Sequence, residues 1–427
     1  MPDIVAPGPS AIIPGQDFVP VVLGGDRLGY SLARSFHMAY GYRTLIVSRM
    51  VAGPIAHSCL VEHRQIPSLE DPELLVATLR DLAPKVGSDK RLLLATTDHV
   101  VSVLARVKHR LDDLYLIPYS EPELIDRLTR KENFAQLCHE LDIPHPATVV
   151  YEVSDHGSDS AAAQLDSLTF PVIAKPSNAE AYAGVDFAGK QKIHSASSRA
   201  ELDDLLGKLH AAGYRDKFIL QDVIPGDDQG MRILTCYVSK QGEVKFACFG
   251  RVLLEEHAPD TRGFPAAIMT GVDHEAVAAA TRLLEHVGWR GWANFDMKFD
   301  PRIGETVFFE LNPRLGGTSF YITAAGHNVV EWYVNEWVKG ESLEGRPVIE
   351  TTTEHVFSAV PVRLLKKYVT DPATKAKLNK LLKDGEVTNP WFYKAEKSPK
   401  RWQWIAMNQV NYVRKYRRYY PEPKALV

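Results

Sequence analysis

The chain has 427 residues, 45% of them hydrophobic and 24% charged, which excludes a disordered chain or a fibrous repeat. A formal net charge of -3 gives no overall attraction to nucleic acid, so we expect no nucleic-acid partner. The four cysteines are scattered without a CxxC pair, which argues against a disulfide framework or a cysteine zinc site.

The beginning of the chain lacks the features of a targeting segment. Residues 1–17 have neither the basic start nor the apolar centre of a secretion signal, and no later apolar run is long enough to span a bilayer. We therefore expect residues 1–17 to be a flexible leader, no integral membrane segment, and a cytoplasmic protein.

Residues 18–120 alternate short apolar segments with segments of helical periodicity. The expected strands are FVPVVL from Phe18, TLIV at 44–47, LLLAT at 92–96 and LYLI at 114–117, with helices after Gly24-Gly25-Asp26, near 72–84 and near 98–110. This alternation predicts an α/β domain with a parallel sheet and helices on its faces. Ligands bind such sheets at the carboxyl ends of the strands, where Gly25, Asp26, Thr97 and Asp98 lie. Tight turns and helix caps explain these residues equally well.

Residues 121–225 predict a linker helix and a small α+β lobe. A long helix is expected from Glu121 to Leu141, ending at Asp142-Ile143-Pro144 because proline disfavours helix in the residue before it. After it come the strand VIAK at 172–175, a small-residue stretch through Gly189, a helix at 199–211 and the strand FILQ at 218–221. The strands MRILTCYV, VKFACFGRVLL, WANFDMKF and TVFFELN, with a helix near 273–287, predict a larger lobe over 226–340.

The strongest local pattern is an acidic hairpin in this larger lobe. Strand alternation puts Asp296 on the same face as Asn294 and Lys298, and it puts Glu310 and Asn312 on one face of the next strand. A turn near residues 302–303 would place Asp296 opposite Glu310, and such oxygen ligands suit Mg²⁺. A solvated surface hairpin is the alternative, but the aromatic flanks favour a buried one, where carboxylates need a cation.

Two lysines and one strand end are candidates for nucleotide contact. Lys175 ends the strand VIAK and precedes a small-residue loop, an arrangement that can cover and neutralise a triphosphate. Lys131 lies on the expected long helix, and either lysine alone is more often a surface charge. The end of the strand at Gln221-Asp222-Val223-Ile224 could read an adenine edge, although a plain Pro-Gly turn is the simpler interpretation.

Together these segments resemble the ATP-grasp superfamily over residues 18–340. The resemblance implies an ATP-grasp fold, α/β and α+β, with an N-terminal Rossmann-like pre-ATP-grasp domain at 18–120 and two lobes at 121–225 and 226–340. It implies ATP and Mg²⁺, with Mn²⁺ as a substitute. The implied roles are phosphate contact for Lys131 and Lys175, adenine contact for Gln221, Asp222, Val223 and Ile224, ribose contact for Asp228, metal ligation for Asp296, Glu310 and Asn312, and contact with the transferred phosphate for Arg314. Lys175 and Arg314 are the implied catalytic residues.

Within the superfamily, VPVVLGGD, QDVIPGDDQGMRIL, ANFDMKFD and FELNPR look like the D-aspartate ligase group of peptidoglycan cross-bridge synthesis. The resemblance implies an ADP-forming carboxylate–amine ligase that works through an acyl phosphate. Its partners would be a small carboxylic acid, such as an amino acid, and an amine acceptor in a cell-wall precursor. The alternatives are a dipeptide-forming L-amino-acid ligase, a kinase that stops at phosphoryl transfer, and a non-catalytic ATP-binding regulatory protein. We also consider a homodimer.

Residues 341–427 form a C-terminal extension that is partly helical and basic. In 394–418, Trp402, Ile405, Val413 and Tyr416 recur near helical spacing. The simpler interpretation is a helix packed on the protein with solvated charges outside. The alternative is peripheral contact with an anionic membrane, or binding of an acidic precursor.

Overall fold

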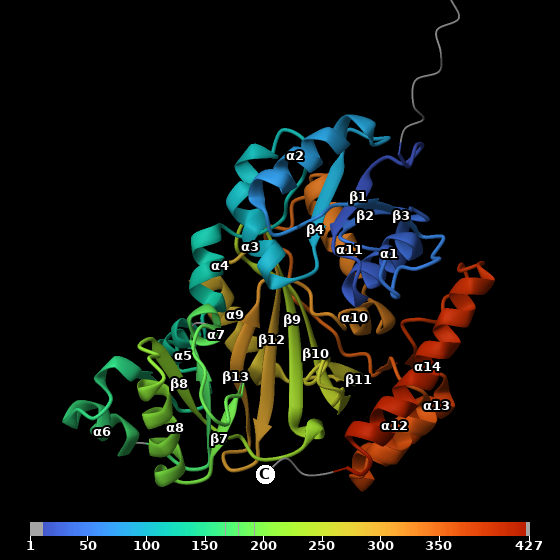
Figure 1. Ribbon diagram of the computed structural model, residues 1–427. Coiled ribbons are helices and arrows are strands. Elements are labelled where there is room, and N and C mark those ends of the chain that lie inside the picture. The colour runs from blue at the N-terminus through green and yellow to red at the C-terminus, as the bar shows by residue number, and fades with distance from the viewer. Residues whose placement is uncertain (1–11, 167, 178, 192, 424–427) are drawn as a thin grey trace, which may run out of the picture. The chain divides into compact units, whose positions relative to one another are not determined.

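The computed structural model describes residues 12–166, 168–177, 179–191 and 193–423 (Figure 1). They fall into two compact units. Among the described residues, the first unit contains 12–125, Asp227–Phe295 and 312–423. The second unit contains Asp126–Gly226 and Asp296–Leu311. The five-part division expected from the sequence, with boundaries after residues 17, 120, 225 and 340, stays a prediction.

Part of the expected leader belongs to the first unit. Residues 1–11 lie outside the described residues. The Ile12 amide donates to the Lys85 carbonyl at 2.7 Å, and the Ile12 carbonyl accepts from the Gly87 amide at 2.9 Å. Backbone hydrogen bonds therefore attach the chain to the first unit at Ile12, while the flexible leader expected at residues 1–17 stays a prediction.

The first unit begins with the predicted parallel sheet, in the strand order β3-β2-β1-β4. Its elements are β1 (Val19–Leu23), α1 (Arg27–Tyr40), β2 (Thr44–Ser48), β3 (Val61–Gln65), α2 (Pro72–Leu82), β4 (Arg91–Ala95) and α3 (Asp98–Val107). The sequence VEHRQ of β3 is too polar to have been predicted as a strand. The expected strand LYLI forms only an isolated bridge between Leu116 and Leu92.

A larger sheet has the strand order β13-β12-β9-β10-β11-β15-β16, with β14 paired to β10. Its strands are β9 (Met231–Val238), β10 (Val244–Glu255), β11 (Pro265–Gly271), β12 (Gly291–Asp300), β13 (Glu305–Asn312), β14 (Ile349–Glu350), β15 (Val356–Ser358) and β16 (Val387–Thr388). The helices α9 (His274–His286), α10 (Phe320–Ala324) and α11 (Val329–Tyr333) accompany it. The boundary between the units runs through β12 and β13.

The strands β12 and β13 form the predicted hairpin. They are neighbours in the sheet, and only residues 301–304 connect them. Parallel neighbours need a crossover of a dozen or more residues, so this pair is antiparallel. Of the five aromatic residues that flank the acidic positions, Trp292, Phe295 and Phe308 are buried as predicted, while Phe299 and Phe309 are half-buried.

The second unit has an antiparallel sheet in the order β5-β8-β6-β7. Its elements are α5 (Lys131–Glu140), β5 (Thr148–Glu152), α6 (Asp159–Asp166), β6 (Val172–Pro176), α7 (Ala179–Ala183), β7 (His194–Ala196), α8 (Arg199–Ala211) and β8 (Lys217–Asp222), and α4 (Pro122–Thr129) precedes them. The single helix expected from Glu121 to Leu141 is wrong. Arg130 has extended backbone, with φ -80° and ψ 122°, so the chain forms two helices and Lys131 begins the second.

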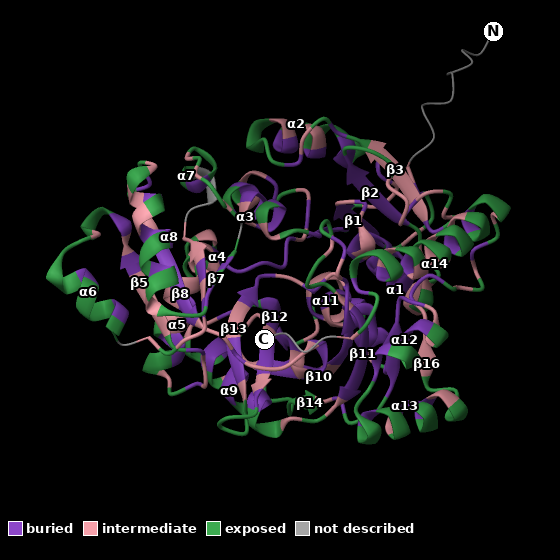
Figure 2. Ribbon diagram, turned by 60° about the horizontal axis from the view of Figure 1, so that its bottom comes forward, coloured by how far each residue is buried: buried purple, intermediate pink, exposed green. Residues whose placement is uncertain are grey.

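The C-terminal part adds α12 (Val362–Tyr368), α13 (Pro372–Asp384) and the 21-residue α14 (Pro399–Tyr419). One face of α14 is buried and the opposite face is exposed (Figure 2). Among the described residues, no helix combines the length and the apolar character needed to cross a membrane.

Candidate active site

The acidic hairpin carries the first pair of candidate side chains in the second unit. Asp296 and Glu310 are both half-buried. The Lys131 ammonium group, at the start of α5, forms an ion pair with the Glu310 carboxylate. The structure thus brings together a predicted phosphate-binding lysine and a predicted metal ligand.

The second lysine lies beside the predicted adenine-binding strand. Lys175 on β6 donates to Oε1 of Gln221 on β8 at 3.1 Å, and Gln221 Nε2 donates to Thr148 Oγ1 at 3.1 Å. Burial and, to a smaller extent, the Lys131 charge lower the pKa of Lys175 to about 8, while the Glu310 charge opposes this shift. Lys175, Lys131 and Glu310 therefore lie within electrostatic range of one another.

Lys298, also in the second unit, fastens the hairpin to the end of β8. Its buried ammonium group donates to the Ile224 carbonyl at 2.7 Å and to the Gly226 carbonyl at 2.8 Å. Gly226 has a φ of 105°, which only glycine adopts readily. Strand alternation placed Lys298 on the hairpin face without a role, although a lysine flanked by Met297 and Phe299 in a strand with buried aromatic residues was the available signal.

A second contact supports the same strand end. The Arg302 guanidinium, in the β12–β13 turn, pairs with Asp222 Oδ2 at 2.9 Å and also with the Asp300 carboxylate. The segment from Asp222 to Gly226 is therefore held by two cationic side chains of the hairpin, Arg302 through the Asp222 carboxylate and Lys298 through two backbone carbonyls. A preorganised strand end of this kind is suited to reading the edge of a planar base.

The small-residue segment after β6 is partly helical, where the sequence predicted a flexible loop. Residues 179–183 form the short helix α7, and positions 178 and 192 lie outside the described residues. Ser177 Oγ donates to Glu132 Oε1 at 3.2 Å, which ties the start of this segment to α5.

The donor chemistry of the hairpin fits a hard divalent cation. Two half-buried carboxylates, Asp296 and Glu310, can supply charge, and Mg²⁺ usually takes one or two carboxylates together with phosphate oxygens and water. In the first unit, Asn312 Nδ2 donates to the backbone carbonyl of Asn294 at 3.4 Å. The Asn312 side-chain oxygen is the acceptor atom and is therefore the one that could bind a metal. No group of three or more His, Cys, Asp or Glu side chains suited to a metal occurs among the described residues.

Arg314 and Asp98 form an ion pair in the first unit. The Arg314 guanidinium contacts the Asp98 carboxylate through Nη2 at 3.0 Å and through Nε at 2.9 Å. A predicted catalytic residue therefore lies beside a candidate residue at the carboxyl end of β4. The hydrogen bond from Nη2 and the ion-pair contact of Nε together orient the guanidinium.

The other candidates at the carboxyl ends of the parallel strands have structural roles. Asp26 caps α1 by accepting from the Gly29 amide at 3.0 Å, and Thr97 caps α3 by accepting from the Val100 amide at 3.3 Å. Gly25 packs closely, because a Cβ there would lie 2.8 Å from Ile55 Cδ1. The capping interpretation therefore holds for Asp26 and Thr97, and their contact with a ligand stays a prediction.

Asp228 is buried in the first unit, at 3% exposure. Its Oδ2 accepts from the Glu255 amide and from His257 Nε2, each at 2.9 Å. The preceding carboxylate, Asp227, is more exposed. Ribose contact through Asp228 stays a prediction, and the geometry gives this residue a structural role as well.

Comparison with known proteins agrees with this arrangement. No family model matches the chain. The D-aspartate ligase of Enterococcus faecium (strain Aus0004) is 31% identical over 418 residues, which cover 96% of this chain and 98% of that protein. The ADP complex of N5-carboxyaminoimidazole ribonucleotide synthetase shares the fold at a TM-score of 0.56 and 14% identity, over 87% of each chain. The L-amino acid ligase from Bacillus licheniformis also shares the fold, at a TM-score of 0.53 and 15% identity, over 76% of this chain and 75% of that chain.

The similarity to the D-aspartate ligase over nearly the whole chain identifies an ATP-dependent carboxylate–amine ligase, and the solved structures show that its fold is the ATP-grasp architecture. The predicted fold class is confirmed. At 31% identity over nearly its whole length, the chain belongs to the D-aspartate ligase family, and the predicted resemblance is confirmed as well.

Proposed function

We propose that the enzyme activates a carboxylate of an amino acid, D-aspartate in the first instance, and joins it to an amine of a peptidoglycan precursor. The substrate follows the activity of the E. faecium relative. The observation that carries the proposal is the cluster of Lys131, Lys175, Gln221 and Glu310 in the second unit. This cluster combines cations for a triphosphate, a strand end for a base and a carboxylate for a metal.

In this proposal the chain's own residues bind and orient ATP. Lys131 and Lys175 would contact the phosphates, while Gln221 and the backbone from Asp222 to Ile224 would contact the adenine. Asp296, Glu310 and Asn312 would hold Mg²⁺, or Mn²⁺ in its place. When bound, the metal would neutralise charge on the phosphate oxygens.

The reaction would proceed in two displacements. A carboxylate oxygen of the amino acid attacks the γ-phosphorus, the bond to the β-phosphate oxygen breaks, and ADP leaves with an acyl phosphate formed. The acceptor amine then attacks the acyl carbon, phosphate leaves, and the amine loses a proton as the amide forms. Arg314, oriented by Asp98, would stabilise negative charge on the transferred group.

We also propose a cytoplasmic enzyme, since the four cysteines are all free among the described residues. A homodimer is a further proposal, which light scattering of the purified protein would test.

The function is tested by measuring ADP formation with each D- and L-amino acid, with and without a lysine-containing cell-wall precursor, while mass spectrometry follows the added amide. The expected result is ADP formation and amide formation only when D-aspartate and the precursor are both present. Amide formation between two free L-amino acids would instead identify a dipeptide ligase. ADP formation with a stable phosphorylated acid would identify a kinase.

A further inference from the structure

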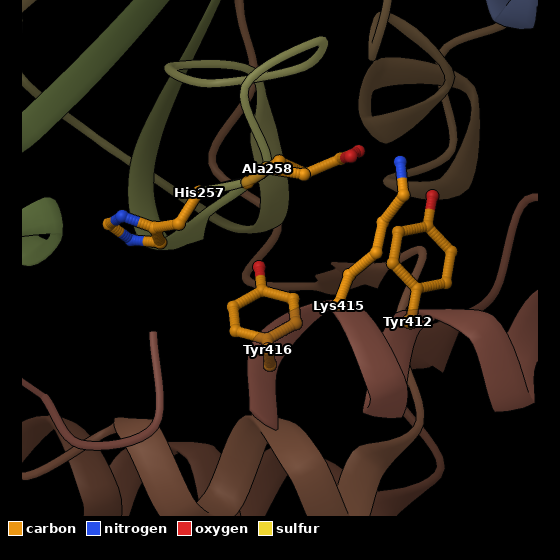
Figure 3. A pocket seen from close by; sticks show the side chains of 6 residues that line it. His257, Ala258, Tyr412, Lys415 and Tyr416 are labelled. Carbon is orange, nitrogen blue, oxygen red and sulfur yellow. The ribbon is translucent and has the colours of Figure 1, made fainter. Parts of the chain in front are cut away.

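The helix α14 belongs to the first unit, and one of its faces is buried against the rest of that unit. Arg401, Ile405, Tyr412 and Tyr416 are buried on this face. Tyr412 and Tyr416 lie beside His257 and Ala258 (Figure 3), and with Glu256 and Lys415 these residues line a cavity of only about 10 Å³. The packing on this side is therefore nearly complete, and the helix has a fixed orientation.

The opposite face of α14 begins with an apolar stripe. Met407 is 63% exposed, Val410 50% and Trp402 38%. Phe392, 46% exposed, stacks on Trp402 with ring centroids 6.1 Å apart and an interplanar angle of 21°. Trp402, Ala406 and Val410 follow one another at the helical spacing of four, and Met407 lies next to Ala406. The exposed apolar side chains are therefore neighbours on the helix surface over two turns.

The same face continues as a basic stripe. Arg414, Arg417 and Arg418 are exposed, at spacings of four, seven and eight from Val410. Residues 394–418 contain eight Lys or Arg and a single Glu, whereas the whole chain has a formal net charge of -3. The positive charge is therefore concentrated in this segment instead of being a property of the whole protein.

We propose that this face of α14, called here the docking face (Phe392, Trp402, Met407, Val410, Arg414, Arg417 and Arg418), rests on an anionic lipid membrane. Arginines attract anionic headgroups, and neighbouring Trp, Met and Val side chains lose water by entering the boundary between headgroups and acyl chains. A soluble acidic ligand would use the arginines but would leave the apolar stripe in water, so the combination favours a membrane. Because the buried face fixes α14 against the rest of the first unit, the helix would lie parallel to the membrane plane when the docking face contacts lipid.

The test uses the full-length protein and sedimentation with vesicles. Vesicles of phosphatidylcholine mixed with phosphatidylglycerol should retain the protein, vesicles of phosphatidylcholine alone should not, and high salt should release it. Replacing Arg414, Arg417 and Arg418 with Gln should lower the affinity by about fivefold per arginine. The double variant Met407→Ser, Val410→Ser should also weaken retention, although it removes no charge.

A matched control removes three positive charges from another exposed part of the first unit. Lys85→Gln, Lys90→Gln and Arg106→Gln should leave vesicle binding unchanged. Circular dichroism and the melting temperature should be unchanged in all variants, because each replaced side chain is exposed or half-buried.

Three outcomes would overturn the proposal: equal retention by neutral and anionic vesicles, retention unchanged in the arginine variant, or loss of a solution dimer in the Met407/Val410 variant without any vesicle binding. The last outcome would assign the face to self-association. Vesicle binding is measured without turnover, so its failure would leave the proposed ligase activity untouched.

Discussion

The Lys131 ammonium group pairs with the Glu310 carboxylate, although 179 positions separate the two residues. Lys131 begins α5, and Glu310 lies in β13. In the proposed reaction these side chains serve different partners, a phosphate and a metal ion. ATP binding would therefore exchange this ion pair for contacts with the nucleotide and its metal, and each side chain can be tested separately.

The substitution Glu310→Gln should reduce amide formation by about 100-fold or more, because it removes a negative ligand from the proposed metal site. Steady-state turnover at saturating ATP and Mg²⁺ measures this effect. The matched control is Glu305→Gln, which changes an exposed residue on the same strand and should keep activity near that of the wild type. If the Glu310 variant turned over as fast as the wild type, at an unchanged melting temperature, Glu310 would not be a ligand of the metal.

ATP affinity should fall as the pH rises from 7 to 9. Lys175 has a pKa of about 8 in the protein without nucleotide, so its ammonium group loses its proton over this range and with it the attraction to phosphate. The decline should approach tenfold per pH unit above 8. Calorimetric titration with a non-hydrolysable ATP analogue measures it, and Lys175→Arg, which stays charged, should show a flat profile. A flat profile in the wild type would contradict phosphate contact through Lys175.

The same residue should make the free energy of unfolding depend on pH. Folding lowers the pKa of Lys175 from 10.5 to about 8, so the unfolded chain binds more protons between these values. The destabilising contribution of protonated Lys175 is therefore fully present below pH 8 and disappears as the pH rises toward 10.5. Lys175→Met should raise the melting temperature at pH 7, even though it should abolish ATP turnover. A lower melting temperature of Lys175→Met at pH 7 would contradict the prediction that the buried ammonium group destabilises the folded protein.

Lys298→Met should raise KM for ATP about tenfold and leave kcat at saturating ATP close to that of the wild type. The variant loses two charge-assisted hydrogen bonds to the Ile224 and Gly226 carbonyls, which orient the proposed adenine-binding strand end. Lys298→Arg should recover part of the affinity. The preference for ATP over GTP should also weaken, a change that simple destabilisation of the fold would not produce. If the nucleotide preference and the KM for ATP were unchanged, Lys298 would have a structural role only and would not position the adenine-binding segment.

Gly24→Ala should cost about 3 kcal/mol of stability, because a Cβ there would lie 2.0 Å from Thr96 Oγ1 and because the φ of 122° suits glycine. Gly41→Ala is the matched control. Gly41 has a φ of 70° and nothing within 4 Å of the added carbon, so its cost should be about 1 kcal/mol. Thermal denaturation of the two variants measures the difference. Equal costs would show that the turn after β1 tolerates displacement.

Local patterns in the sequence were sufficient for most elements that carry the candidate site. The expected helix at 199–211 coincides with α8, and the strand VIAK with the first residues of β6. The caps at Asp26 and Thr97 also follow from residue type. Each of these features depends on hydrogen bonds or periodic contacts within a few residues, so the amino acids in a short window determine it.

Residue types and their periodicity were thus sufficient for most strands and helices, for the shared face of Asp296 and Lys298, and for the resemblance to the ligase family. The folded chain was needed to show that the helix breaks at Arg130, that Lys131 pairs with Glu310, and that Lys298 contacts the end of β8. The residues in each of these two contacts are more than 70 positions apart and meet because whole strands and helices pack together, which no local pattern specifies.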